Sequence, residues 1–405
     1  MDSRAVLTTL GISYSHDGFD TEWAQSGAGF PAVAETFLDG LDLDSLARRV
    51  PIADEAIPGL IEGARIVRNS QALLRLFWHC HCALVDRGRH FAVPPECAMM
   101  GERRGMLQVL LAVTAVPALL ARHAAFAIAP DITNATLDDI ALWMRDYHKK
   151  NGRWGLAQLG WLRNHILGDL FRLGRLQFMS ARANTHILGC RNMHTGDLCT
   201  LAAPGAYRAD GFFDGLNNVN DPAAWHAAQH INAVSVAGHP VTQDGRVARE
   251  PVTLPLSEWR IVLRDGDDVL DVHIPAEMPL DTNACITSFS EALGFFRELC
   301  PGRNHKAFVC CSWLLDSQLA SLLPAESNIV RFQRLFRLHP SHLGEHQTYE
   351  RVFGDYSADP ETLPAVTRLQ KACLQHIRAG GRFAEGNGFI LVDDLRAAGA
   401  SPGTS

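Results

Sequence analysis

Three segments between residues 269 and 312 decide the fold: VLDVHIPA at 269–276, SFSEALGFFREL at 288–299 and AFVCCS at 307–312. The first and third are short apolar runs, which are typical of buried strands. The middle segment carries apolar residues at helical spacing. A strand, a helix and a second strand in this order predict a βαβ unit with two parallel strands.

The sequence on both sides of this unit predicts more strands and helices. An Asp265-Gly266 step between the expected strands 259–263 and 269–274 favours a hairpin. Residues 205–232 are crowded with Gly, Asn, Asp and Pro, and we expect a surface insertion there. The other expected elements are strands at 175–179, 186–190, 197–202, 234–236 and 388–392, and helices at 156–173, 317–323 and 364–378. Residues 328–335 are expected to be either helical or extended.

Residues 1 to about 165 carry helical patterns instead. Apolar residues recur at helical spacing over 54–85 and over 100–123, and the pattern changes after Gly152. We therefore predict a mixed α/β (α+β) chain. Its parts are a mainly helical domain at 1–152, a sheet domain at 153–396 and a disordered tail at 397–405.

Charge and composition bound the class of protein. The chain has 405 residues, and its 37 Lys and Arg against 44 Asp and Glu leave a net charge of −7. A nucleic-acid-binding surface is normally basic, so we expect no nucleic-acid partner. The start of the chain lacks the pattern of a signal peptide, and the apolar run 106–121 is too short to span a bilayer. We therefore expect a cytoplasmic protein with no membrane partner.

The ten cysteines are scattered along the chain. Without a secretory signal, we expect buried thiols rather than a disulfide framework. The run His79-Cys80-His81-Cys82 contains residue types that bind metals. Alternate residues on a helix point apart, however, and no second matching pair lies nearby, so we expect no metal.

A longer set of motifs carries a family resemblance. It comprises Gly174–Phe178, Val269–Ala276, Ser288 with Phe295 and Phe296, Phe308–Asp316, Leu322–Pro324, Ser327–Ile329 and Phe332–Gln333. These motifs resemble a bacterial acyltransferase family with an N-acyltransferase N-terminal domain and a GNAT-like C-terminal domain. The resemblance implies a helical N-terminal domain followed by a GNAT-like mixed β-sheet flanked by helices. It is detailed over residues 135–392 and looser before them.

The resemblance also implies a function. It implies an enzyme that moves an acyl group from a pantetheine thioester to an amine or other nucleophile of a small-molecule acceptor. In a GNAT-like sheet two neighbouring parallel strands diverge, the pantetheine arm enters between them, and the diphosphate lies at the start of the next helix. Mapped onto this chain, the diverging strands are 269–274 and 307–312. The implied donor-binding residues are Ile274, Thr287, Ser288, Phe289, Ser290, Cys310, Ser327 and Asn328.

Helix capping explains the Ser and Thr residues of this set equally well. The chain also departs from the family pattern, because the segment 279–287 (PLDTNACIT) contains no glycine and carries an additional acid. A close nest of backbone donors for a diphosphate is less expected there. The donor is therefore either acyl-CoA or an acyl carrier protein, used as a co-substrate, with no permanently bound cofactor. The helical domain is expected to close over the acyl pocket or to form a homodimer.

Three residues are the candidate catalytic groups. His273, near the end of the first diverging strand, suits a general base because imidazole titrates near neutral pH. Ser312 is a candidate proton donor to the leaving thiolate, and Trp313 a candidate wall of the acyl pocket. The structural alternatives are a histidine bonded within the sheet, a strand-end cap and a core aromatic.

Other readings of these residues remain open. Cys310 or Cys311 could act as a covalent nucleophile, although buried packing is the simpler role. Glu385 could enter the acceptor pocket from the closing strand. The altered segment before the helix also fits a non-catalytic module that binds thioesters or assists assembly.

Overall fold

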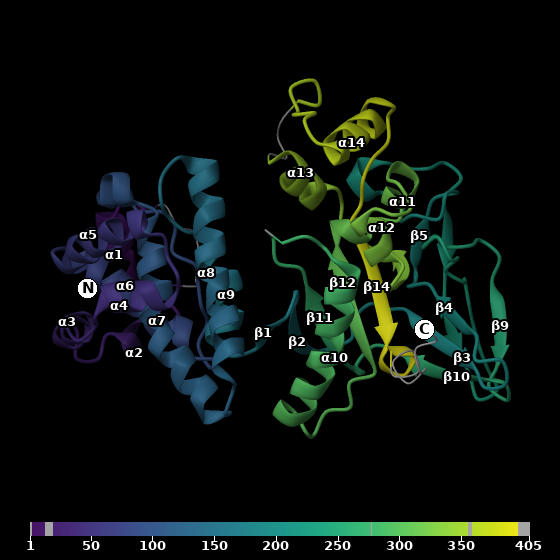
Figure 1. Cartoon of the computed structure of the whole chain (residues 1–405), viewed down its shortest axis with the longest axis horizontal. Coiled ribbons are helices and arrows are strands. Elements are labelled where there is room, and N and C mark those ends of the chain that lie inside the picture. Colours follow the sequence, from purple (N-terminus) through teal and green to yellow (C-terminus); the bar gives the residue numbers. More distant parts are fainter. Residues whose placement is uncertain (1, 13–18, 277, 355–358, 396–405) are drawn as a thin grey trace. The chain divides into compact units, whose positions relative to one another are not determined.

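The computed structural model describes residues 2–12, 19–276, 278–354 and 359–395 (Figure 1). It divides into two compact units, Met1–Leu173 with Pro275–Glu277, and Gly174–Ile274 with Met278–Ser405. Residues 153–173, which the sequence analysis assigned to the sheet domain, therefore belong to the first unit. The tail predicted at 397–405 lies outside the described residues.

The first unit is mainly helical. Its elements are α1 Ser3–Thr9, α2 Trp23–Ser26, α3 Ala32–Asp39, α4 Leu43–Arg49, η1 Asp54–Ala56, α5 Ile57–Arg68, α6 Gln71–Val85, η2 Ala98–Arg103, α7 Met106–Ala125, α8 Pro130–Asn151, α9 Leu159–Ile166 and β1 Leu170–Leu173. By length and composition α7 could cross a membrane, but most of it is buried inside this unit. It continues through Pro117 and supplies the centre of the apolar core. The first unit therefore forms its core around α7.

The histidines of α6 bind separate neighbours. His79 Nδ1 lies 2.8 Å from Ser26 Oγ, and His81 Nδ1 lies 3.2 Å from Thr114 Oγ1. Burial lowers the pKa of both imidazoles to about 4, so they are neutral at physiological pH. Among the described residues, no three His, Cys, Asp or Glu side chains gather as a metal site would require.

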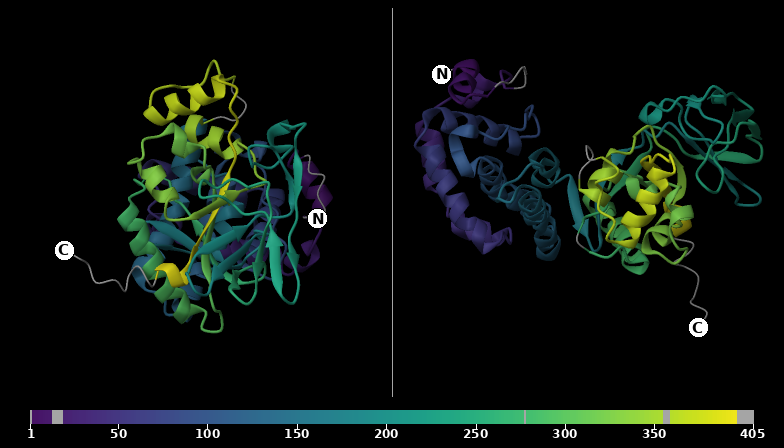
Figure 2. Two further views of the ribbon diagram at one scale, coloured as in Figure 1. Left: turned by 90° about the vertical axis from the view of Figure 1, so that its right-hand side faces the viewer. Right: turned by 90° about the horizontal axis from the view of Figure 1, so that it is seen from above.

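The second unit contains a main sheet, three small sheets and several helices (Figures 1 and 2). Its strands are β2 Leu176–Arg182, β3 Leu188–Asn192, β4 Leu198–Leu201, β5 Gly205–Tyr207, β6 Trp225–Ala227, β7 His230–Ile231, β8 Ser235–Gly238, β9 Val252–Pro255, β10 Trp259–Leu263, β11 Asp268–His273, β12 Ala307–Ser312, β13 Arg337–Pro340 and β14 Gly386–Leu391. Its helices are η3 Leu216–Asn218, α10 Thr282–Leu299, η4 Trp313–Leu315, α11 Leu319–Leu322, α12 Asn328–Gln333, α13 His346–Phe353 and α14 Arg368–Arg378.

The main sheet of this unit runs in the order β2-β11-β12-β14-β13. β11 and β12 are parallel and are joined through α10, whereas the other neighbours are antiparallel. The βαβ unit predicted between residues 269 and 312 is confirmed. The structure also contains β13 and α13, which the sequence analysis did not predict.

The two faces of the main sheet differ in chemistry. On one face, α10 packs its Phe289 against Phe178 and Phe308, with ring centroids 5.9 and 4.8 Å apart. On the other face, Val269 and Ala307 pack against Leu263 of β10 near the starts of β11 and β12. The small sheets (teal in Figures 1 and 2) gather on one side of the main sheet. Near the ends of β11 and β12 this second face becomes polar, and it carries His273 and the paired Gln177 there.

Residues 205–232 form regular secondary structure with a buried aromatic cluster, and not the irregular surface insertion that was expected. They contain β5, η3, β6 and β7, and Tyr207, Phe213 and Trp225 form a buried aromatic cluster. The Tyr207 and Phe213 rings stack with centroids 4.4 Å apart. The expectation of a surface insertion is wrong because these aromatics, spaced among turn residues, bury enough apolar surface to form a small core.

Candidate functional site

The parallel ladder between β11 and β12 ends before either strand does. The two strands pair only from Val269 with Ala307 to Asp271 with Val309. β11 nevertheless continues along β2 as far as His273, and β12 continues along β14 as far as Ser312. The strands therefore diverge, and we call the opening between 272–273 and 310–312 the strand gap.

Two polar side chains of β11 lie on one face beside the strand gap. Asp271 and His273 are two residues apart, so they share a face of the strand. His273 Nε2 lies 3.4 Å from Asp271 Oδ2, and both side chains are partly exposed. The carboxylate and the imidazole are thus near neighbours beside the strand gap, where a proton acceptor for an attacking amine would have to lie.

A second polar group lies across the strand gap on the same face. The register that pairs Asp271 with Val309 places Cys311 level with His273. Cys311 Sγ lies 3.6 Å from Glu385 Oε2 and 3.8 Å from Ser341 Oγ. We call Asp271, His273, Cys311 and Glu385 the polar face.

The pKa values of Glu385 and of the two cysteines of β12 are all raised. Glu385 is almost entirely buried, and desolvation raises the pKa of its carboxyl. The Cys311 residue reaches the surface, but desolvation of its sulfur, reinforced by the negative charge of Glu385, raises the pKa of the thiol to about 12. Burial likewise raises the pKa of the neighbouring Cys310 thiol well above its ordinary value. Both thiols are therefore protonated at neutral pH and are weak nucleophiles.

The backbone that presents Glu385 is held by side chains from several segments. Glu345 is buried, is paired with Arg382, and accepts a hydrogen bond from the Phe383 N–H at 3.3 Å. Asn217 Nδ2 donates to the Phe383 carbonyl at 2.7 Å. Asn217 lies in η3, within the segment first expected to be a surface insertion.

The helix after β11 begins earlier than the sequence analysis expected. α10 begins at Thr282, and its N-cap residue Asp281 accepts a hydrogen bond from the Ala284 N–H at 2.8 Å. The predicted helix start at 287–290 is therefore wrong, because the Asp281 cap and the burial of Cys285 add a helical segment before it.

The four residues predicted at that start lie inside α10. Ser288 is fully buried; its Oγ accepts from the Arg175 N–H at 2.7 Å and donates to the Ala284 carbonyl at 2.9 Å. Phe289 is a core residue, and Thr287 and Ser290 are exposed on the outer surface of the helix. Their N–H groups belong to the helix ladder, so these residues offer no cluster of backbone donors to a phosphate.

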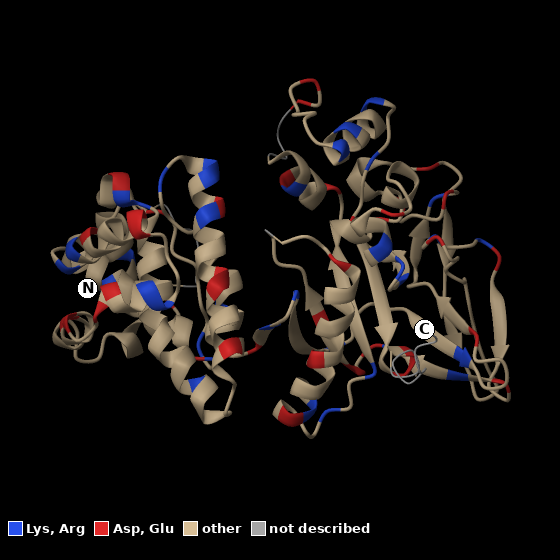
Figure 3. Cartoon of the chain, viewed as in Figure 1, with Lys and Arg blue, Asp and Glu red and all other residues tan. Residues whose placement is uncertain are grey.

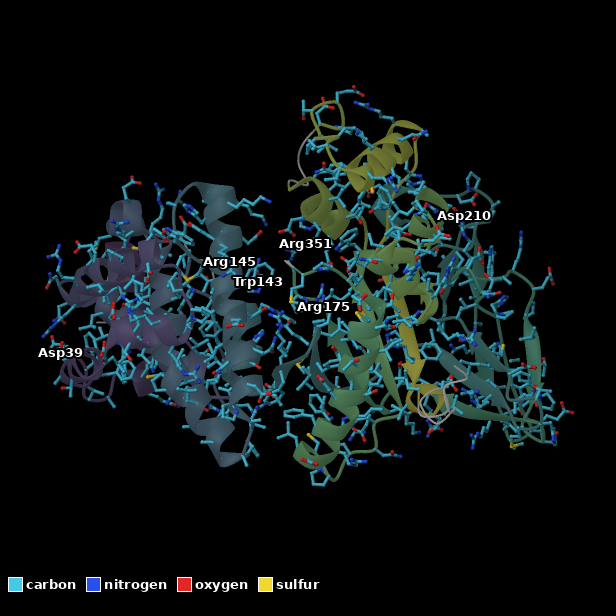
Figure 4. The ribbon with its side chains drawn as sticks, viewed as in Figure 1. Asp39, Trp143, Arg145, Arg175, Asp210 and Arg351 are labelled. Carbon is cyan, nitrogen blue, oxygen red and sulfur yellow. The ribbon has the colours of Figure 1, made fainter. Side chains whose placement is uncertain are left out.

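Arg175, which Figure 4 labels, is hydrogen-bonded to the loop before α10. The buried guanidinium of Arg175 donates to the carbonyls of Met278 and Pro279, at 2.8 and 2.9 Å. Prolines have no N–H, and Asp281 adds a negative charge at the helix start. This end of α10 is therefore poorly suited to an anion.

Two family models match the chain and meet close to the boundary between the units. The N-acyltransferase N-terminal domain matches residues 41–168, and the GNAT-like C-terminal domain matches residues 170–390. The chain belongs to the family with the GNAT-like C-terminal domain. The strand gap lies within this GNAT-like domain, and both models describe acyltransferase domains. The protein is thus an acyltransferase by family, as the sequence motifs predicted.

Solved structures share the fold of the whole chain. A crystal structure of an acyltransferase in complex with decanoyl-CoA and teicoplanin is 21% identical, with a TM-score of 0.69 over 97% of this chain and 100% of that chain. An acyltransferase with CoA and 10C-teicoplanin is also 21% identical, with a TM-score of 0.67 over 97% and 100%. No curated protein matches the sequence. At this identity the likeness concerns the fold.

Ser327 and Asn328 line a cavity of about 480 Å³ in the GNAT-like domain. Ser327 also caps α12 by accepting a hydrogen bond from the Val330 N–H at 3.3 Å, which is the structural alternative considered for it. The cavity has an apolar wall and a charged rim. The wall comprises Leu323, Pro324, Ile329 and Leu369, and the rim carries Glu326 and Arg368.

The remaining predicted residues lie around the strand gap. Ile274 directly follows β11, and Cys310 is buried in β12. Ser312 Oγ accepts a hydrogen bond from the Leu314 N–H at 3.2 Å, as a strand-end cap does. Trp313 packs with Leu319 in an apolar cluster beyond the end of β12. The catalytic roles of His273, Ser312 and Trp313 stay predictions.

Sequence reasoning missed some residues that the structure brings to the site. Asp271 lies two residues before His273, and the period of the strand could have placed both on one face. Asp316 and Arg368 had no local signal of this kind. Asp316 reaches the site through contacts distant in sequence, and Arg368 lines the cavity because α14 lies beside α12.

Proposed function

We propose that this protein transfers an acyl group from an acyl-CoA to an amine of a small-molecule acceptor. The amine nitrogen forms a bond to the thioester carbonyl carbon, the carbon–sulfur bond breaks, and the products are an amide and free CoA thiol. The observation that carries the proposal is the strand gap. Its unpaired strand edges offer backbone groups to the amides of a pantetheine arm.

Residues of the polar face would handle the protons. The imidazole of His273 takes a proton from the attacking amine, and the nearby Asp271 carboxylate stabilises the imidazolium that results. Glu385 lies across the strand gap, and burial raises the pKa of its carboxyl, so it is the second candidate group for proton exchange. The leaving thiolate recovers one proton from the Ser312 hydroxyl, which is the proposed relay and takes up a proton from solvent in the same step.

The structural neighbours suggest the first substrates to test. They are acyltransferases in complex with decanoyl-CoA, octanoyl-CoA and teicoplanin. We therefore propose a medium-chain acyl-CoA as the donor and an amine-bearing small molecule as the acceptor, with teicoplanin as the first compound to test. An acyl carrier protein as donor, a homodimer and a cytoplasmic location are further proposals that follow from the sequence.

A non-catalytic thioester-binding module is the second candidate. The observation that favours it is the start of α10, where Asp281 and Pro279 replace the glycine-rich segment of ordinary GNAT enzymes. Such a module would bind the donor at the strand gap but would not release CoA thiol.

The test combines binding with turnover. The thermal midpoint is measured with decanoyl-CoA, octanoyl-CoA, acetyl-CoA and free CoA, because a ligand that binds the folded state raises it. Release of CoA thiol is then followed with teicoplanin and simple amines as acceptors. Binding with acceptor-dependent release supports the enzyme. Binding without release from any acceptor favours the non-catalytic module, and no binding contradicts both.

A further inference from the structure

Phosphate recognition at the start of α10 is disfavoured in this chain. The cap residue Asp281 carries a negative charge, and its carboxylate already occupies the Ala284 N–H. Pro279 has no N–H, and its carbonyl is directed to Arg175. Since the donor of the proposed function carries phosphates at its nucleotide end, those phosphates need another cation.

The cavity beside α12 offers a cation for these phosphates. Arg368, the first residue of α14, lines it together with Ser327 and Asn328. Its side chain is exposed, and it has no ion pair with any residue in the described ranges. α14 carries three Lys or Arg residues and no acidic one, and Figure 3 shows blue positions along this helix.

The cavity is also linked to the strand gap through apolar packing. Three residues of its wall, Leu323, Ile329 and Leu369, belong to the same apolar cluster as Trp313. Trp313 directly follows Ser312, the last residue of β12 and one edge of the strand gap. The same apolar cluster therefore extends from the end of β12 to the cavity that Arg368 lines.

We infer that this cavity binds the nucleotide end of the donor, with Arg368 paired to one of its phosphates. This inference rests on the proposed function and adds a specific donor subsite to it. The apolar wall contacts the nucleoside, and the guanidinium forms charge-assisted hydrogen bonds to the phosphate. Glu326 on the same rim opposes phosphate binding by its charge.

The test measures dissociation constants by calorimetry with the full-length protein. CoA, dephospho-CoA and pantetheine are compared in the wild type, in Arg368→Gln and in Glu326→Gln. Arg378→Gln is the matched control, because it is an exposed arginine of the same helix about 15 Å away. The thermal midpoint of each variant without ligand checks that it is folded.

We expect Arg368→Gln to weaken CoA binding about tenfold and to leave pantetheine binding unchanged. Glu326→Gln should strengthen CoA binding, and Arg378→Gln should have no effect. If Arg368→Gln weakens the binding of both CoA and dephospho-CoA, Arg368 pairs with the diphosphate. If it weakens the binding of CoA alone, Arg368 pairs with the 3′-phosphate. An equal effect on all three ligands, or none on CoA, overturns the inference while the proposed function stands. Failure of the wild type to bind CoA contradicts both.

Discussion

The Asp316 carboxylate accepts a hydrogen bond from the backbone N–H of Ala384 at 2.9 Å. This contact joins the turn after β12 to the segment that carries Glu385 into the polar face. Asp316 also accepts from the Gln318 N–H at 3.0 Å, and Gln318 in turn donates to the Arg382 carbonyl at 2.9 Å. The position of Glu385 therefore depends on a buried carboxylate that is remote in sequence.

Asp316→Asn should change how stability depends on pH. Burial raises the pKa of Asp316 to about 6, above the value near 3.9 of an unfolded chain. The folded state therefore binds more protons between these values, and this contribution to stability is full below pH 4 and is lost as pH rises through 6. The wild type should lose on the order of 3 kcal/mol relative to the variant over this range. Urea unfolding at pH 4, 5, 6 and 7 measures it, and parallel curves for the two proteins would show that Asp316 does not titrate in this way.

Gly386→Ala should destabilise the second unit. An added Cβ would lie 1.9 Å from the Leu315 carbonyl oxygen, so the backbone of η4 or β14 would have to move. We expect a loss of about 2–4 kcal/mol in the free energy of unfolding. The control is Gly294→Ala in α10, where nothing lies within 4 Å of the new Cβ. That change should stabilise the protein by up to about 1 kcal/mol. If both variants lose a similar amount of unfolding free energy, the steric clash at Gly386 is not the cause.

His273→Asn should lower kcat about a hundredfold or more and leave donor binding unchanged, because general base catalysis typically contributes this much. Asp271→Asn should lower kcat less, because it only removes the charge beside the imidazole. The exposed His226 on β6 serves as the control for His273. If Glu385→Gln abolishes turnover while His273→Asn retains it, the proton acceptor is Glu385 instead.

Cys311→Ala should keep most of the activity. The thiol has a pKa of about 12 and donates toward Glu385, so it is not poised to attack a thioester. Cys310→Ala tests the other thiol of β12, and its effect should be confined to stability because this side chain is buried. Loss of turnover with intact CoA binding in either variant would instead support a covalent acyl-enzyme.

The regular elements could be predicted where the local pattern was strong. β12 was predicted with its observed bounds, Ala307–Ser312, and so was β10 at Trp259–Leu263. The family motifs also predicted the acyltransferase domains that the family models match. The beginning of α10 was misplaced, because Thr and Asn are weak helix formers in isolation and their helix depends on the Asp281 cap and on tertiary packing.

The sequence by itself determined the βαβ unit around β11 and β12, because alternation and helical spacing are local properties of the chain. Only the tertiary structure decided where the ladder between these strands ends, since that depends on what β2 and β14 impose on each strand. It also decided that Cys311 meets Glu385, 74 residues away, and that Arg368 lines the cavity beside α12. Such contacts depend on chain segments that are distant in sequence, and no local spacing encodes them.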